Sequence, residues 1–353
     1  MNSLFELSIL DSYSPDYAIA LARCGSDIAI RKIPFGAELD RLISFSANIL
    51  GVLNGTAFIK RPDSAEVVNF GHSLFNFVLR EDLLRLYNRL PETHVTLNVL
   101  TNQTRIRQLP WEYLQEPQGQ CPRAGRSVVR LVPNVGGKAF QPLAKDGITR
   151  VLLIAADPVG LRDVDWEDVK MTLERTYRAR TGDANLDLKV VEGGTRQSLT
   201  DAVLNHPCDI VHFSCHGAVV KDVGRLILKE SNSNRADHID ARELGTLLAD
   251  RNIRLVILSA CETSTTKGQG DFANIAETLI RQGIPAVVAN QAPARNKTTA
   301  AFVGALYREL LSSGNIDKAM TAGRIALCIE LRGDPEWGIP TLHRLHGADV
   351  LYS

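Results

Sequence analysis

The chain has 353 residues, which is enough for one large domain or two of moderate size with a substantial core. Its 40 Lys and Arg balance its 40 Asp and Glu, so no net charge favours nucleic acid or an anionic membrane as a partner. The N-terminal sequence MNSLFELSIL lacks the basic start and long apolar core of a signal peptide, and no run of about 18 apolar residues exists to span a bilayer. We therefore expect a cytoplasmic protein that binds neither nucleic acid nor membranes.

Residues 1–65 predict a β-rich accessory region. Apolar and polar residues alternate in FELSIL, YAIALARC and DIAIRKIPF, as in antiparallel strands with one face in solvent. A helical segment follows at 37–50. The region contains no group of catalytic side chains.

Residues 66–147 predict a second region, which begins with a helical pattern at 69–90 and a strand-like run, THVTLNVL. The segment LPWEYL follows at 109–114. Gly and Pro are frequent from 116 onward, which indicates a meandering connection with one strand, SVVRLV, inside it. We place a domain boundary near Gly147.

Residues 148–353 alternate between strand and helix patterns. Strand-like runs lie at 150–156, 186–192, 208–214, 253–260 and 285–290, with helical segments between them and after the last. This order is typical of βαβ units and predicts an α/β fold in which a mostly parallel sheet is sandwiched by helices. RLILKE predicts part of a small hairpin, and Asp240 with Glu243 predicts a helix capping box.

Two of these strands end in residues with reactive side chains. His216 and Gly217 follow the strand at 208–214, and Cys261, 45 residues after His216, follows the strand at 253–260. Ligands bind at the carboxyl ends of strands in open α/β sheets, and neighbouring strands lie about 5 Å apart. We therefore predict that Cys261 is a nucleophile whose proton His216 carries, the pair that covalent acyl transfer requires. Gly217 lets a ligand approach the backbone closely, so the N–H groups of Gly217 and Cys261 are candidates for an oxyanion hole.

His212 is a rival for the base. It shares a strand face with His216 but lies about 13 Å further back, so we expect it to be buried, hydrogen-bonded and structural. The nearby His206, Cys208 and Cys215 do not form a zinc site with these histidines, because an extended strand points its side chains to opposite faces. We expect no metal and no cofactor.

The six cysteines show no framework of short repeating spacings, so we expect reduced thiols rather than disulfides. Most are interpreted as small buried hydrophobes. Position at a strand end singles out Cys261.

The chain resembles the CHAT family, the caspase-like domains of clan CD that are related to separase. The matching residues are HFSCHG at 212–217, LSACET at 258–263, LPWEYL at 109–114, GIPAVVA at 283–289, and Trp337 with Pro340. The resemblance covers about residues 65–353. It implies that residues 66–147 contain the end of a degenerate caspase-like half and a linker, and that residues 148–353 form the caspase-like catalytic domain.

The resemblance also implies a cysteine endopeptidase that performs limited proteolysis of a protein substrate through Cys261 and His216, with Gly217 and Cys261 as oxyanion donors. It implies a role in bacterial signalling or antiphage defence, for example the activation of a gasdermin-like target, and a regulatory protein partner. We expect the substrate to bind as an extended strand beside the sheet edge.

Residues at the neighbouring strand ends are candidates for the substrate pocket: Asp157, Ser259, Asn290 and Gln291. Asp157 or Asp163 would accept a basic side chain and Arg162 an acidic one, and the sequence does not choose between them. The loop 262–271 either orders over the substrate, is self-cleaved near Lys267, or is a plain surface loop.

Two other classes of function stay open. One is a non-catalytic interaction module that keeps the fold, which the intact His–Cys pair disfavours. The other is a thiol hydrolase or acyltransferase that acts on a small molecule and needs a deep, closed pocket.

Overall fold

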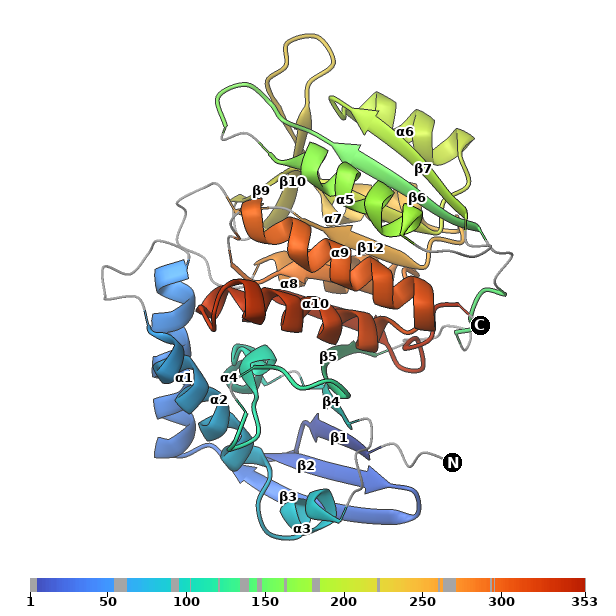
Figure 1. The fold of residues 1–353 in the computed structure, drawn as a ribbon. Helices are drawn as coiled ribbons and strands as arrows, with labels where there is room; N and C mark the ends of the chain where they lie inside the picture. Colours follow the sequence, from blue (N-terminus) through green and yellow to red (C-terminus); the bar gives the residue numbers. More distant parts are fainter. Residues whose placement is uncertain are drawn as a thin grey trace.

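The computed structural model describes residues 5–53, 62–89, 95–101, 103–119, 121–133, 140–144, 148–161, 164–179, 185–220, 223–259, 261–262, 271–292, 294 and 296–352. Eleven strands in this part of the chain form one sheet, in the order β3-β2-β1-β4-β5-β15-β14-β12-β8-β6-β7. Figure 1 shows the sheet running along the whole molecule, with β7 near the top and β3 near the bottom.

The strands of the main sheet have the following bounds: β1 Phe5–Leu10, β2 Tyr17–Cys24, β3 Asp27–Pro34, β4 Val95–Val99, β5 Arg126–Val132, β6 Ile148–Ala155, β7 Asn185–Glu192, β8 Ile210–Ser214, β12 Leu255–Leu258, β14 Ala286–Asn290 and β15 Pro340–Leu345. β14, β12, β8, β6 and β7 run parallel to one another, as do β1, β4, β5 and β15. The two parallel blocks run in opposite directions and meet where β15 pairs antiparallel with β14.

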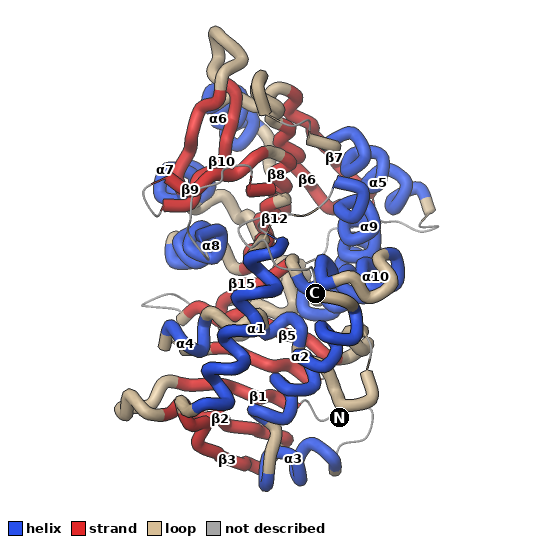
Figure 2. Tube along the Cα trace, turned by 90° about the vertical axis from the view of Figure 1, so that its left-hand side faces the viewer, coloured by secondary structure: helices blue, strands red, loops and turns tan. Residues whose placement is uncertain are grey.

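Helices cover the sheet, and their bounds are α1 Ala37–Leu53, α2 Ser64–Val78, α3 Glu81–Asn88, α4 Thr104–Arg107, α5 Trp166–Arg178, α6 Arg196–Asn205, α7 Ala241–Leu248, α8 Asp271–Arg281, α9 Asn296–Ser313 and α10 Ile316–Glu330, with 3-10 turns at Trp111–Tyr113 and Pro335–Gly338. In the C-terminal half, α5, α9 and α10 lie on one face and α6, α7 and α8 on the other (Figure 2). The predicted α/β fold, a mostly parallel sheet between helices, is confirmed.

Alternation along the strands builds two hydrophobic cores in the C-terminal half. Ile210 of β8 packs into the core that α5, α9 and α10 cover, and Val211, the next residue, packs into the core under α6, α7 and α8. Successive strand residues point to opposite faces, so a strand buried on both faces must be apolar throughout. This requirement explains why the central strands read as unbroken apolar runs.

The N-terminal strands follow a different pattern, because one of their faces is open. β1 pairs antiparallel with β2, and β2 with β3, and buried residues alternate with half-buried ones along β1. The predicted antiparallel strands with one solvated face are therefore confirmed. Only the buried face joins the core, which extends from Phe5 to Tyr352.

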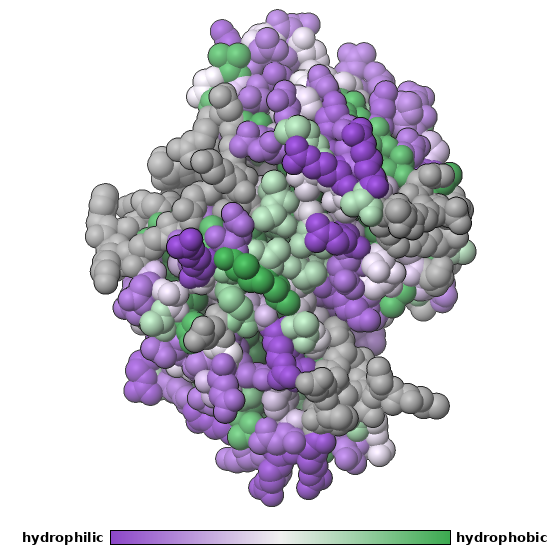
Figure 3. All heavy atoms as spheres, in the orientation of Figure 1, coloured by the Kyte–Doolittle hydropathy of each residue, from purple (hydrophilic) through white to green (hydrophobic). Residues whose placement is uncertain are grey.

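The main sheet passes through all three sequence regions, 1–65, 66–147 and 148–353, without a break. Their division into domains stays a prediction. Among the described residues, no helix is long and apolar enough to cross a membrane. The face in Figure 3 is mostly hydrophilic, with a narrow hydrophobic band over α9 and α10.

A second, four-stranded sheet lies beside the main one, with the order β11-β10-β9-β13. Its bounds are β9 His216–Val220, β10 Val223–Lys229, β11 Ala236–Asp240 and β13 Cys261–Glu262. The predicted hairpin strand at 225–230 is β10. Asp240 and Glu243 form the predicted capping box at the start of α7, so both local predictions are confirmed.

The expectation that all cysteines are reduced thiols is wrong for one pair. Cys121 and Cys328 form a disulfide across 207 residues of sequence, with their Cα atoms 5.9 Å apart. Cys121 lies in the segment before β5, and Cys328 lies in α10. The fold brings the two thiols together. A local spacing pattern cannot predict a disulfide between cysteines that are so far apart in the sequence.

We expect the disulfide to be visible as a count of reactive thiols. Iodoacetamide added to denatured, unreduced protein should label four of the six cysteines, and prior reduction should expose all six. Reduction should lower the free energy of unfolding by about 2–4 kcal/mol, because the unfolded chain regains the freedom of a long closed loop. In the control, Cys328→Ser, five cysteines should label with or without reductant. Six labels on unreduced wild-type protein would contradict the bond.

Candidate active site

The structure places the backbones of His216 and Cys261 opposite each other. β8 and β12 are parallel neighbours in the main sheet, as predicted, with Phe213 level with Leu258. Just beyond, β9 and β13 pair in parallel, and His216 is level with Cys261. Neighbouring strands lie about 5 Å apart. The two residues singled out in the sequence therefore occupy adjacent backbone positions at the carboxyl edge of β8 and β12.

Gly217, the other predicted oxyanion donor beside Cys261, lies inside the small sheet. It is level with Glu262 of β13 and with Leu226 of β10. A side chain at this position would project from one face of the small sheet, close to the backbone of Cys261. Glycine keeps the backbone next to Cys261 uncovered.

One prediction about the two histidines is wrong, because His212 and His216 do not share a strand. β8 ends at Ser214, and His216 opens β9, which leaves the main sheet to pair with β10 and β13. The strand-like sequence pattern continues past Ser214, so no local signal marks the end of β8. The strand ends there because the following residues pair with β10 and β13 instead. Flanked by strands on both sides, His216 is 2% exposed, so it is a buried residue rather than an open cleft residue.

His212 has the surroundings predicted for it. It is fully buried, with Nδ1 3.2 Å from the Tyr307 hydroxyl and Nε2 2.9 Å from the Ser259 hydroxyl. Its ring stacks on Tyr307 of α9 at 6.0 Å between centroids. Burial lowers the pKa of His212 to about 3. A neutral imidazole that joins α9 to the end of β12 has a structural role.

We expect His212 to make the fold sensitive to acid. The folded protein keeps His212 neutral down to about pH 3, whereas the unfolded chain protonates it below about pH 6.5. Since the unfolded state binds the extra proton, the free energy of unfolding falls as the pH falls through this window, by up to about 1.4 kcal/mol per unit. His212→Asn should reduce the slope of unfolding free energy against pH by up to that amount. The exposed His346→Asn is the control, and equal slopes for wild type and His212→Asn would contradict the assignment.

Asp157 is the charged residue that the structure brings to His216. It follows β6, which lies next to β8, and its Oδ1 is 3.7 Å from Nε2 of His216. The Asp157 side chain is 31% exposed. A carboxylate at this distance favours the protonated imidazole. From the sequence, Asp157 is predicted only to line the substrate pocket. Its position after the strand that neighbours β8 is the feature that could have predicted its approach to His216.

The other residues predicted to line the substrate pocket differ in whether their side chains form hydrogen bonds within the protein. The Ser259 hydroxyl bonds His212, as described above. Asn290 is the half-buried last residue of β14, level with Pro340. The Gln291 side-chain amide donates to the Gly338 carbonyl at 2.7 Å and to Glu112 at 3.2 Å. Ser259 and Gln291 therefore contribute to the framework around the site.

Other residues considered from the sequence lie outside the described residues. They are Arg162, Asp163 and the loop segment around Lys267. Their predicted roles stay predictions.

The motif LPWEYL forms a joint between the two halves of the molecule. The Tyr113 ring packs edge-on against Trp337 at 5.0 Å, and its hydroxyl donates to the Pro335 carbonyl at 2.5 Å. Glu112 is buried, with both carboxylate oxygens bonded to Arg130 at 2.9 and 2.8 Å. Burial alone would raise the pKa of Glu112, but the Arg130 guanidinium outweighs it and holds the pKa below its ordinary value. Through Gln291 this joint reaches the end of β14.

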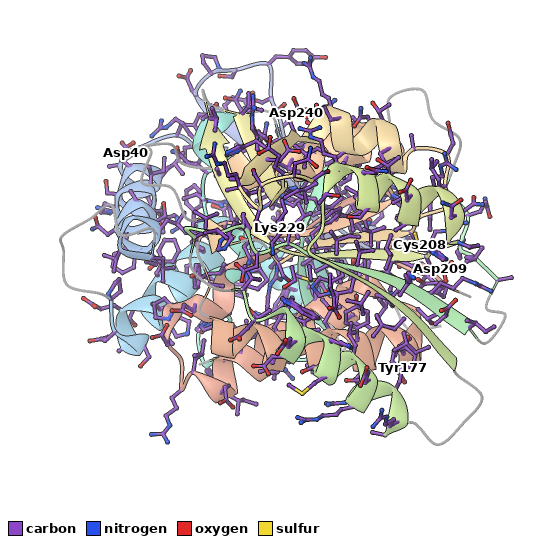
Figure 4. The ribbon with its side chains drawn as sticks, turned by 90° about the horizontal axis from the view of Figure 1, so that it is seen from above. Asp40, Tyr177, Cys208, Asp209, Lys229 and Asp240 are labelled. Atoms are coloured by element: carbon purple, nitrogen blue, oxygen red, sulfur yellow. A yellow bond between two sulfur atoms is a disulfide. The ribbon has the colours of Figure 1, made fainter. Side chains whose placement is uncertain are left out.

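Three other cysteines are free thiols in the described part of the chain: Cys24, Cys208 and Cys215. Cys208 lies beside Asp209 just before β8, apart from Lys229 at the end of β10 (Figure 4). Burial, and then the Asp209 carboxylate, raise the pKa of the Cys208 thiol to about 11. Cys215 is buried and Cys24 half-buried. Burial therefore makes Cys208 and Cys215 poor nucleophiles.

Comparison with known families identifies the class of protein to which this site belongs. Residues 69–336, more than half of the chain, match the model of the CHAT domain. The chain belongs to the CHAT domain family. The matched range includes His216, Cys261 and the segment LPWEYL.

Among solved structures, two of the separase–securin complex from Saccharomyces cerevisiae are similar to this chain. The TM-scores are 0.47 and 0.45, with 10% and 11% sequence identity. Each match covers 97% of this chain but 30% of the chain in the solved structure. No curated protein sequence matches the chain.

Proposed function

We propose that the protein is a cysteine endopeptidase that cleaves a protein substrate through Cys261 and His216. The observation that carries the proposal is the pairing of β9 with β13, in which His216 is level with Cys261. Membership of the CHAT domain family, whose domains resemble the caspase-like proteases of clan CD, supports the same chemistry. The Cys261 thiolate attacks the carbonyl carbon of the scissile bond, and the leaving amine takes its proton from His216.

Burial of His216 disfavours the protonated imidazole that this mechanism needs, so a neighbouring carboxylate has to favour it. The Asp157 carboxylate, 3.7 Å from Nε2, stabilises that cation and orients the ring. The backbone N–H groups of Gly217 and Cys261 are the proposed donors to the oxyanion of the tetrahedral intermediate. In this proposal Asp157 is a positioning residue for His216, and Asn290 remains a candidate for contact with substrate.

We further propose that the substrate binds as an extended strand. β13 lies at the end of the small sheet, with β9 on one side of it. A peptide that pairs with the other side of β13 has its backbone next to Cys261, and main-chain hydrogen bonds hold it there. The biological setting we propose is limited proteolysis in the bacterial cytoplasm, in signalling or antiphage defence under the control of a regulatory partner, with a gasdermin-like protein as one target.

Selective alkylation tests the assignment of the nucleophile. Iodoacetamide at neutral pH should modify Cys261 before the other thiols, because a cysteine beside an imidazole has more thiolate. Buried Cys208 and Cys215 should react slowly, and half-buried Cys24 is the internal comparison. The measurement is the time course of labelling at each cysteine by peptide mapping.

The control for the alkylation is His216→Ala. It should slow the labelling of Cys261 and leave the rate at Cys24 unchanged. If Cys24 labels first in the wild-type protein, or if His216→Ala leaves the Cys261 rate unchanged, the proposed pair is wrong.

A further inference from the structure

A mostly enclosed cavity lies in the N-terminal half, between the strands β1, β4 and β5 and the helices α2, α3 and α10. Figure 1 shows these strands between α10 and α3. The volume of the cavity is about 70 Å³, and its walls include Leu7 of β1, Leu97 of β4, Val128 of β5 and Phe75 of α2. Of the described residues that line it, Arg123 alone is exposed, so the way in from solvent lies beside that residue.

Arg324 of α10 lines the cavity as a buried cation that has no ion-pair partner among the described residues. It is 3% exposed, and its hydrogen bonds go to backbone carbonyls. Nε and Nη2 donate to Pro340 at 3.1 and 2.9 Å, and Nη1 donates to Val128 at 3.4 Å. A guanidinium has five N–H groups, so two of them remain for a further acceptor.

The two carboxylates that act on Arg324 are already neutralised by other arginines. Glu112 accepts two hydrogen bonds from Arg130, and Asp317 accepts two from Arg344. Burial lowers the pKa of Arg324 to about 10, and these carboxylates oppose that effect only at longer range. The group of five therefore keeps one positive charge. A buried charge is costly unless a counter-charge compensates it, so an anionic ligand is favoured here.

The charged groups nearer to solvent do not repel an anion. Glu116 accepts hydrogen bonds from Arg126 at 2.7 Å, from Arg123 at 3.1 Å and from the Tyr87 hydroxyl. All four of these residues line the cavity. Because two guanidinium groups bond the one carboxylate, this end of the cavity is not negative, and Arg324 at the other end attracts a carboxylate inward.

Gln115 adds a buried amide to the same cavity. Its backbone N–H donates to the Gly71 carbonyl at 3.3 Å, which fixes the residue against α2. The side chain is 3% exposed, and neither its Oε1 nor its Nε2 bonds to any described residue. Buried polar atoms in native proteins almost always have a partner. A hydroxyl both donates and accepts, so a ligand hydroxyl suits an amide that offers one acceptor and one donor group.

We propose that this cavity binds a short aliphatic hydroxy acid. Its carboxylate pairs with Arg324 in a charge-assisted contact, its hydroxyl bonds the Gln115 amide, and its carbon chain lies against the apolar walls. A water needs about 10–15 Å³ and a cavity of about 150 Å³ takes benzene, so a volume of about 70 Å³ suits an acid of about three carbons. The site does not depend on the proposed peptidase activity, because neither Cys261 nor His216 lines it.

Isothermal titration calorimetry on the full chain, in a buffer free of other small carboxylates, tests the site with four three-carbon probes. Lactate and 3-hydroxypropionate carry both groups at different spacings, propionate lacks the hydroxyl, and 1,2-propanediol lacks the carboxylate. We expect saturable binding of whichever hydroxy acid has the better spacing. Propionate and 1,2-propanediol should each bind about 10- to 100-fold more weakly.

Variants on separate elements locate the site. Gln115→Met keeps the length of the side chain but removes the amide, and Arg324→Met removes the charge. Each should weaken binding of the preferred hydroxy acid about 10- to 100-fold. The matched controls change exposed residues: Gln118→Met lies in the same segment as Gln115, and Arg251→Met lies elsewhere. Both controls should bind like the wild-type protein.

Three results would overturn the proposal. The first is that neither hydroxy acid binds at millimolar concentration. The second is that propionate or 1,2-propanediol binds as tightly as the hydroxy acids. The third is that Gln115→Met binds the preferred acid like the wild-type protein, and this result decides the matter even if Arg324→Met does not fold.

Discussion

Cys261→Ala is expected to abolish peptide-bond cleavage while the protein stays folded. The substitution removes the only group in the proposed site that forms a covalent bond with the substrate, so the loss should reach the detection limit. A small thiol leaves at most a small cavity, and the free energy of unfolding should change by no more than about 1–2 kcal/mol. The measurement is cleavage of a diverse peptide library, read by mass spectrometry, together with chemical denaturation.

Matched controls separate the role of Cys261 from general effects of losing a thiol. Cys24→Ala removes a half-buried thiol from β2 and should cleave the library like the wild-type protein. A Cys261→Ala variant that cleaves at the wild-type rate would refute the mechanism. If the wild-type protein cleaves no peptide but forms an acyl-enzyme with small thioesters, the chain is a small-molecule thiol hydrolase or acyltransferase instead.

His216→Ala and His212→Ala should separate catalysis from structure. His216→Ala is expected to lower the cleavage rate by about 10²–10⁴, the contribution of a general acid–base group. His212→Ala breaks the contacts with Tyr307 and Ser259 inside the sheet and should cost about 1–3 kcal/mol of stability. Its cleavage rate at a temperature where it remains folded should stay close to that of the wild type.

Because both histidines are buried, stability alone does not distinguish them, and the comparison depends on activity per folded molecule. His216 is 2% exposed, so His216→Ala should also lose some stability. Denaturation curves and cleavage rates are therefore measured on the same samples at low temperature. An active His216→Ala beside a folded but inactive His212→Ala would reverse the two assignments.

The local pattern of the sequence was sufficient for the C-terminal half-sheet and for the candidate pair. Strands buried on both faces must be apolar throughout, so β8 and β12 are visible as runs that stop at a definite residue. Parallel strands end at one edge, so the strand pattern predicts that His216 and Cys261 lie at the same edge of the sheet. The pairing of β8 with β12 and of β9 with β13 then makes them neighbours. The capping box at Asp240 is equally local, because its two partners, Asp240 and Glu243, lie within one turn of the same helix.

Only the tertiary structure revealed β15, which joins the two parallel blocks and was missed in the sequence. Its residues Thr341, His343 and Arg344 are polar yet buried, so the segment does not read as a central strand. Arg344 is compensated by two hydrogen bonds of 2.8 Å to Asp317, on α10. A buried charge is tolerated only when a partner neutralises it, and here the partner is 27 residues away in sequence.

Dependence on partners that are distant in the sequence also explains the other features that the sequence did not predict. The end of β8 depends on the pairing of β9 with β10 and β13, and the Cys121–Cys328 bond closes over 207 residues. The approach of Asp157 to His216 depends on β6 and β8 being neighbours. Periodicity and spacing report which residues a segment buries. Which distant group each buried residue meets is decided by packing, because that contact forms only when the whole sheet assembles.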